Sequence, residues 1–188
     1  MKNMAKALEL KSICKSFDGK QALNQASLKV EWGEVHALLG ENGAGKSTIM
    51  NVATGVYSPD DGEIYKDGLS LRMSSPTDAV RAGLGMVHQH FRLVKRFTVA
   101  ENILLACRGQ LGIRSGSEAA RAVEEKGEEI GFPVDPDAMI AHLSVAEQQR
   151  VEILKVLLLG ARIVILDEPT AVLTDKESES VLSFVRQM

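Results

Sequence analysis

The eight residues from 40 to 47, Gly-Glu-Asn-Gly-Ala-Gly-Lys-Ser, match the phosphate-loop pattern G-x-x-x-x-G-K-[ST] at every position. The apolar-rich segment 34–39 precedes them and is predicted to be a strand, and segment 48–53 follows and is predicted to be a helix. A glycine-rich turn can match the pattern by chance, but the flanking strand and helix favour a phosphate-binding loop. The chain is therefore expected to have an α/β fold.

The residue types in this loop suit an anionic ligand. Glycines let successive backbone N–H groups turn toward phosphates, in a conformation that a Cβ atom would obstruct. The Lys46 ammonium supplies a positive charge for the β- and γ-phosphates, and the Ser47 hydroxyl suits Mg²⁺. The start of the following helix adds unpaired N–H groups and a favourable dipole.

Composition and charge are those of an ordinary globular protein. The 188 residues suffice for one domain with a sizeable core, and 45% of them are hydrophobic and 25% charged. The net charge of −3 does not indicate a broad attraction to nucleic acid. The two cysteines, Cys14 and Cys107, give neither a disulfide framework nor metal-ligand spacing. No segment predicts a membrane span or a secretory signal, so a role at a membrane would need another chain.

The remaining sequence predicts a strand-rich core that is interrupted by a helical block. Asp-Gly at 18–19 predicts a turn between two strands. The segment from 162 to 167 contains four consecutive apolar residues, 163–166, and is typical of a parallel strand that is buried on both faces. Strands are predicted at 7–13, 25–30, 63–65, 83–88 and 162–167, and helices at 76–82, 99–105, 118–130 and 144–159.

Two carboxylates, Asp167 and Glu168, follow the apolar run directly. A buried strand of an open α/β sheet presents its carboxyl end where such sheets bind ligands. There Asp167 would hold Mg²⁺, most often through water, and Glu168 would orient or deprotonate an attacking water. Alone, the pair is no more than a strand with an acidic turn. Together with a phosphate loop, it favours phosphoryl-transfer chemistry.

A third motif opens the helix predicted at 144–159. Ser144 and Glu147 form an S-x-x-E capping box, which by itself indicates only a well-capped helix. Small residues from 144 to 146 leave the helix N-terminus open, so that it could also receive an anion.

At this segment the chain resembles the ABC ATPases, whose signature motif is Leu-Ser-Gly-Gly-Gln; here residues 143–147 are Leu-Ser-Val-Ala-Glu. The order of phosphate loop, Gln89, signature and Asp167-Glu168 is the order of that superfamily. Segments 40–50, 86–91, 145–155 and 166–174 look like the ATP-binding subunits of bacterial importers for simple sugars and purine nucleosides. Those subunits usually carry two ATPase domains in tandem, and the chain resembles the first of them over nearly its whole length.

The resemblance implies a P-loop NTPase fold with a RecA-like α/β core, an N-terminal antiparallel β subdomain and an inserted α-helical subdomain. Residues 1–97 and 161–188 would form the nucleotide-binding core of a single ABC ATPase domain, and 98–160 the helical subdomain. In the family the domain sits peripherally on the cytoplasmic face of the inner or plasma membrane. Its partners are a second ATPase domain, transmembrane permease subunits and, indirectly, a solute-binding protein; nucleic acid is not a partner.

The resemblance also gives roles to residues, with ATP and Mg²⁺ as cofactors. Phe17 stands where an aromatic ring stacks on adenine, and Gln89 where a glutamine contacts Mg²⁺ and the attacking water. The catalytic set would be Glu168, Lys46 and Gln89, and the metal set Ser47, Gln89 and Asp167. The ATP-binding set would be Phe17, Gly40, Asn42, Gly43, Ala44, Gly45, Lys46, Ser47 and Thr48. The signature residues Ser144, Val145, Ala146 and Glu147 would meet ATP held by the partner domain.

Three departures from the family pattern stand out. Thr174 replaces the Asp that often ends the D-loop, which puts a role in communication between subunits in doubt. Ala146 stands where the family generally has Gly, and its methyl group could crowd the phosphate of the opposing domain and make that site weaker. The family's switch histidine lies beyond residue 188, and the last strands of the core are expected to be missing. We therefore expect the chain to bind ATP with little turnover.

Two other classes of function stay open from the sequence. A soluble ABC ATPase that acts on DNA or ribosomes would share the three motifs, although such proteins typically carry long coiled coils or added arms. The compact insertion and the lack of a basic stripe favour the importer. An inert ATP-binding fragment is the other alternative, but the intact Lys46, Asp167 and Glu168 indicate an active parent.

Overall fold

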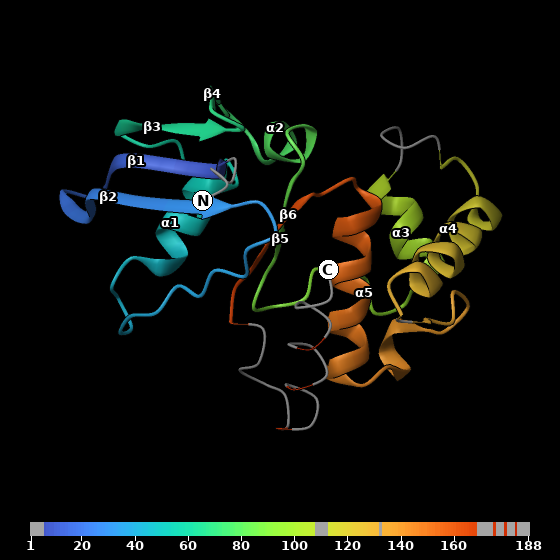
Figure 1. Cartoon of the computed structure of the whole chain (residues 1–188). Coiled ribbons are helices and arrows are strands. Elements are labelled where there is room, and N and C mark those ends of the chain that lie inside the picture. Colours follow the sequence, from blue (N-terminus) through green and yellow to red (C-terminus); the bar gives the residue numbers. More distant parts are fainter. Residues whose placement is uncertain are drawn as a thin grey trace. The chain divides into compact units, whose positions relative to one another are not determined.

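The computed structural model describes residues 6–107, 113–131 and 133–168, together with the single residues 175, 179 and 183. It divides into two compact units, residues 1–82 and 83–188 (Figure 1). The division of the sequence expected at 97/98 and 160/161 stays a prediction. Among the residues that the structure describes, no helix is long and apolar enough to cross a membrane.

The first unit is built on a long antiparallel hairpin of β1 (Lys6–Phe17) and β2 (Lys20–Glu31). Asp18 and Gly19 both have positive φ in the connecting turn, as a tight hairpin requires. β3 (Asp61–Lys66) pairs with β1, and β4 (Leu69–Ser70) pairs with β3, which gives the strand order β2-β1-β3-β4. The predicted strands at 7–13, 25–30 and 63–65 are confirmed, and all three are longer than predicted.

One face of this sheet contacts helix α1 (Lys46–Ala53), which follows the phosphate loop. Both elements contribute apolar side chains to the core of the unit; the buried ones include Leu10, Ile13, Leu23, Ile49 and Val52. The short helix α2 (Pro76–Arg81) begins with proline after the N-cap residue Ser75, as predicted.

The predicted strand at 34–39 is wrong for the structure as described. These residues form no helix or strand, and the side chains of Val35 and Leu39 are 60% and 88% exposed. An extended segment becomes a strand only when a neighbour accepts its hydrogen bonds, and no described strand of the first unit pairs with it. Its apolar composition predicted a strand inside a sheet with buried side chains, whereas the side chains of this segment are exposed.

The second unit contains a parallel pair of strands, β5 (Leu84–Val87) and β6 (Ile163–Leu166). Val87 lies opposite Leu166, so both strands end at the same edge. The parallel pairing confirms the prediction, but burial on both faces is wrong, because all four β6 residues are only half-buried. Among the strands that the structure describes, β5 alone pairs with β6, which leaves the other edge of β6 without a strand to cover it.

The other regular elements that the structure describes in the second unit are helices, in agreement with the predicted helical block. They are α3 (Val99–Cys107), α4 (Gly116–Glu129), the 3₁₀ turn η1 (Ile140–His142) and α5 (Val145–Leu158). Their apolar faces form one core, whose most buried members include Val99, Ile103, Val123, Ile140 and Val151. A second, smaller cluster of Val87, Ile153 and Val156 joins α5 to β5.

Candidate nucleotide site

The phosphate loop lies in the first unit as an exposed turn with two left-handed glycines, Gly43 at φ 85° and Gly45 at φ 93°. Gly45 also lies close to the hairpin, since a Cβ there would be 2.9 Å from the Ala22 carbonyl oxygen and 2.9 Å from Leu23 Cδ2. A Cβ on Gly43 would meet nothing within 4 Å. The two glycines therefore have different roles. Gly45 lets the loop pack closely against the sheet, while the space beside Gly43 is open for a ligand.

Lys46 lies folded over the loop. Its Nζ donates to the carbonyl oxygens of Gly40 at 2.6 Å and Glu41 at 2.9 Å. The ammonium is thus held above the same turn whose N–H groups are expected to face phosphate. Carbonyls are neutral acceptors, so a phosphate anion would be a stronger partner for this charge.

The N-terminus of α1 is left without a side-chain cap. Its N-cap residue is Gly45, no side chain accepts from its first N–H groups, and no acidic residue lies in its first turn. Ser47 is exposed and Thr48 half-buried in that turn, and Asn42 and Ala44 are exposed in the loop before it. The first N–H groups of a helix need an acceptor, so this end suits an anion.

Phe17 ends β1, in the same unit, and is 38% exposed. Its ring packs edge-to-face on Tyr57, with the ring centroids 5.0 Å apart and the planes at 68°. Lys15 Nζ lies 5.7 Å from the Phe17 ring centroid and forms an ion pair with Asp60 at 2.6 Å. Tyr57 and Lys15 were not predicted from the sequence; the signal for Tyr57 was an aromatic residue just beyond the loop helix.

The second unit brings Gln89 and Glu168 together. They follow the ends of β5 and β6, and Gln89 Nε2 donates to Glu168 Oε2 at 2.9 Å. The Asp167 N–H donates to the Val87 carbonyl at 3.0 Å, which extends the pairing of the two strands by one residue. Glu168 has φ 48°, a left-handed backbone that turns the chain immediately after the strand.

A buried ionic group lies next to this strand end and was missed by the sequence analysis. Glu152 on α5 is 2% exposed and lies 2.7 Å from Lys155 Nζ, measured to its Oε2. Burial lowers the pKa of His88, and the positive charge of Arg92 lowers it further. The negative charge of Asp167 raises the pKa of His88, but by less than burial lowers it. His88 is therefore neutral near pH 7.

The signature segment forms the predicted capping box at the start of α5. Ser144 Oγ accepts from the Glu147 N–H at 3.2 Å, and Glu147 Oε2 accepts from the Ser144 N–H at 2.7 Å. Hydrogen bonding by the Ser144 side chain, and then by its N–H, lowers the pKa of Glu147. Val145 is 39% exposed, whereas Ala146 is only 6% exposed.

The predicted residues thus fall into two groups, and each group is formed within one unit. The first unit holds the phosphate loop and Phe17; the second holds the strand-end carboxylates, Gln89 and the signature. The predicted D-loop, which ends at Thr174, lies outside the described residues. Among the described residues, no cluster of three or more His, Cys, Asp or Glu side chains could hold a metal, so any Mg²⁺ site would rely on hydroxyl, amide or water oxygens as well.

Comparison with known proteins adds an independent line of evidence. The sequence model of the ABC transporter family matches residues 23–171. The nucleoside import ATP-binding protein of Lactococcus lactis subsp. cremoris is 44% identical over 96% of this chain and 36% of its own length. The guanosine import ATP-binding protein of Bacillus subtilis is 46% identical over 98% of this chain and 36% of its own length. The chain thus spans about a third of the curated relatives that it matches.

Solved structures agree with the fold expected from the sequence. The ADP conformation of an ATP-binding cassette from an ABC transporter is similar with a TM-score of 0.84 and 25% identity. That similarity covers 97% of this chain and 76% of the solved chain. A nucleotide-free ATP-binding cassette has the same TM-score of 0.84 at 24% identity. These structures confirm the P-loop NTPase fold, with its antiparallel β subdomain and helical part.

Proposed function

Because the chain belongs to the ABC transporter family, we propose that it is an ATP-binding domain of an importer for simple sugars or nucleosides. The observation that carries the proposal is the phosphate loop, which offers three features to an anion. They are the open space beside Gly43, the Lys46 ammonium that lies over the loop, and the N-terminus of α1, which has no side-chain cap. Similar relatives act in import of nucleosides, guanosine and ribose, which supports this class of solute. The chain would act on the cytoplasmic face of the membrane, held there by its partners.

The phosphate loop would bind the triphosphate of ATP. Backbone N–H groups beside Gly43 and at the start of α1 would bind phosphate oxygens, and Lys46 would exchange its two carbonyl contacts for phosphate. The exposed face of Phe17 would stack on the adenine, since a planar ring suffices for that contact.

The strand-end residues would serve the chemistry of hydrolysis. Asp167 and Ser47 would hold Mg²⁺, which supplies charge neutralisation when it is bound. Glu168 would orient the attacking water or accept its proton, and Gln89 would hold the Glu168 carboxylate through the 2.9 Å hydrogen bond. In phosphoryl transfer such positioning and charge neutralisation provide most of the catalysis.

The start of α5 would meet ATP that is held by a second ATPase domain. Ser144, Val145 and Glu147 of the signature are exposed there, whereas Ala146 is buried. Glu147 is engaged within the capping box. The buried position of the Ala146 methyl group argues against the idea that it crowds an opposing phosphate, although a weaker composite site stays a prediction.

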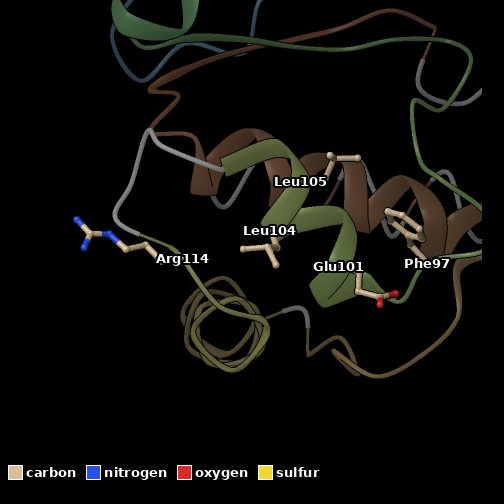
Figure 2. A pocket seen from close by; sticks show the side chains of 5 residues that line it. All are labelled: Phe97, Glu101, Leu104, Leu105 and Arg114. Carbon is tan, nitrogen blue, oxygen red and sulfur yellow. The ribbon is translucent and has the colours of Figure 1, made fainter.

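A permease subunit would bind the helical part of the second unit. A pocket of about 400 Å³ lies beside α3 and is lined by five residues, Phe97, Glu101, Leu104, Leu105 and Arg114. Figure 2 shows the side chains of these residues. Phe97 and Leu105 are 37% and 57% exposed. Neighbouring apolar side chains at the surface are typical of a protein–protein interaction site. The pocket combines apolar side chains with one acidic and one basic side chain, which suits a short amphipathic helix of a membrane protein.

Nucleotide titration of the 188-residue chain tests this proposal. We expect saturable ATP binding that is lost in Lys46→Ala and kept in Lys126→Ala, a lysine of α4 with an exposed glutamate partner. Equal ATP affinity in both variants would contradict a role for the phosphate loop. Thermal unfolding of both variants shows whether any loss of binding comes from loss of the fold.

A further inference from the structure

The loop that follows Gln89 is held by two buried side-chain clamps. The first comes from α5. Glu152 Oε1 accepts from the Arg92 N–H at 2.6 Å, while its Oε2 pairs with Lys155 Nζ at 2.7 Å. Lys155 Nζ in turn lies 3.4 Å from the Arg92 carbonyl oxygen, to which it donates. Both backbone polar groups of Arg92 are therefore engaged by one ion pair of the helix that begins at the signature.

The second clamp comes from α3 and has the same design. Asn102 Oδ1 accepts from the Val94 N–H at 2.7 Å, and Asn102 Nδ2 donates to the Val94 carbonyl at 3.2 Å. Asn102 is 4% exposed, and its Nδ2 also donates to the Thr98 carbonyl at 2.9 Å. Residues 92 and 94 are thus fixed to two different helices by side chains that bind both the backbone N–H and the carbonyl oxygen of one residue.

The burial of these groups shows that the clamps are more than incidental contacts. The Glu152 and Lys155 side chains are 3% and 13% exposed, and a buried charge is costly unless it is paired and hydrogen-bonded. Replacing the pair by apolar residues would often stabilise a protein, so stability alone is a weak reason for such a pair. Every partner of the carboxylate that the structure gives belongs either to the loop or to the ion pair itself.

We propose that Glu152, Lys155 and Asn102 are positioning residues that join the loop after Gln89, α3 and α5 into one body. Gln89 lies three residues before Arg92, so the clamps set where its amide stands relative to Glu168. Displacement of α3 or of the signature helix would then move Gln89 and weaken its hydrogen bond to Glu168. The catalytic consequence of this displacement rests on the function proposed above, whereas the clamp itself does not.

NMR spectroscopy of the 188-residue chain tests the clamp without any nucleotide. In Lys155→Met we expect amide exchange at Arg92 to accelerate about tenfold or more, because the Glu152 carboxylate that accepts its N–H loses its buried charge partner and the Arg92 carbonyl loses its donor. The side-chain amide signal of Gln89 should shift in the same variant toward that of Glu168→Gln. Lys155→Arg, which keeps the charge, should restore both signals, and Lys126→Met breaks an exposed ion pair of α4 as the matched control.

A second variant covers the case in which Lys155→Met does not fold. Asn102→Leu removes the acceptor of the Val94 N–H together with both donated hydrogen bonds, and its side chain has a similar size. It should accelerate exchange at Val94 and shift the Gln89 signal. Faster exchange at Arg92 or Val94 with an unchanged Gln89 signal would overturn the proposal, because the clamps would then be merely structural. Unchanged exchange at both residues would overturn it as well.

Kinetics of the intact ATPase that contains this chain test the catalytic consequence. Lys155→Met should lower kcat about tenfold and leave the KM for ATP unchanged, since Lys155 does not belong to the phosphate loop. A rise in KM with unchanged kcat would contradict a positioning role. If the parent protein neither binds nor hydrolyses ATP, the proposed function fails while the NMR result on the clamp still stands.

Discussion

Two helices of this chain begin at predicted phosphate sites, yet their N-termini are built in opposite ways. α1 begins at Gly45 with no side-chain cap and no acidic residue in its first turn. α5 begins with a complete capping box, in which the carboxylate of Glu147 already accepts a backbone N–H. An uncapped end leaves its N–H groups for a ligand, whereas the capping box of α5 already engages the N–H groups of Ser144 and Glu147. Under the proposed function, α1 would hold phosphate through these N–H groups, and α5 would mainly present a rigid surface.

The largest expected effect concerns the strand-end carboxylate. Glu168→Gln should slow ATP hydrolysis by the intact ATPase by about 10²- to 10⁴-fold, the usual worth of a general base. ATP affinity should not fall, because Glu168 is proposed to act on the attacking water and does not belong to the phosphate loop that binds ATP. Steady-state hydrolysis and nucleotide binding are measured in parallel, with the exposed Glu125→Gln of α4 as control. Robust hydrolysis by Glu168→Gln would show that another group handles the water.

Gly43→Ala should weaken ATP binding at the phosphate loop that precedes the uncapped helix α1. The new Cβ meets no protein atom, so any effect beyond backbone strain falls on the ligand. We expect ATP affinity to drop about tenfold or more, which corresponds to the loss of one charge-assisted hydrogen bond. Gly68→Ala is the matched control, since Gly68 also has positive φ and open space in the β3–β4 turn. Equal affinity in the two variants would mean that the ligand does not approach Gly43.

The capping box of α5 has a counterpart at Ser115 and Glu118 of α4. Comparing variants of the two boxes separates the effect of a cap on protein stability from an effect on ATP hydrolysis. Ser144→Ala and Ser115→Ala should each lower the free energy of unfolding by about 0.5–2 kcal/mol. Only Ser144→Ala should also lower hydrolysis by the intact ATPase, because α4 carries no signature. Denaturant unfolding and hydrolysis rates give the two readouts. A similar loss of hydrolysis in both variants would reduce the signature to a stability effect.

Ala146→Gly sharpens the same comparison from inside the first turn of α5. The Ala146 methyl group is buried, and glycine in a helix costs about 1 kcal/mol relative to alanine. We therefore expect a small loss of stability in thermal unfolding. Faster hydrolysis by the intact ATPase would support the hypothesis that alanine weakens the composite site, and an unchanged rate would count against it.

The smallest expected effect is a dependence of stability on pH near neutrality. The folded-state pKa of His88 lies below the unfolded value of about 6.5, chiefly through burial. The unfolded chain therefore binds more protons in this range, and stability falls as the pH drops from about 6.5 through the folded pKa. His88→Gln should flatten the dependence between pH 7 and pH 5.5 in unfolding experiments. An unchanged slope would assign it to other groups.

How much the sequence could predict depends on the distance over which each feature is determined. The phosphate loop and the capping box at 144–147 are local patterns, and both lie where they were predicted. The parallel pairing of the strand before Asp167 followed from its apolar run. The strand at 34–39 was predicted from composition alone, and composition does not show whether a neighbouring strand is present to pair with it.

The missed residues share a different property. Glu152 and Arg92 are 60 residues apart in sequence, and Asn102 resembles any other polar residue of an amphipathic helix. A buried glutamate leaves no periodic signal, because its carboxylate is satisfied by backbone groups that only the folded chain brings near. Tyr57 was overlooked for the same reason, since its contact with Phe17 spans the hairpin and the loop helix.

The central claim is that the first unit binds the phosphates, while Asp167 of the second unit acts through Mg²⁺. ATP titration of the wild-type chain and of Asp167→Asn, each with and without Mg²⁺, tests this claim most directly. We predict that both proteins bind ATP without the metal and that Mg²⁺ tightens binding mainly in the wild type. Equal tightening by Mg²⁺ in Asp167→Asn, or no ATP binding by the wild-type chain, would contradict the claim.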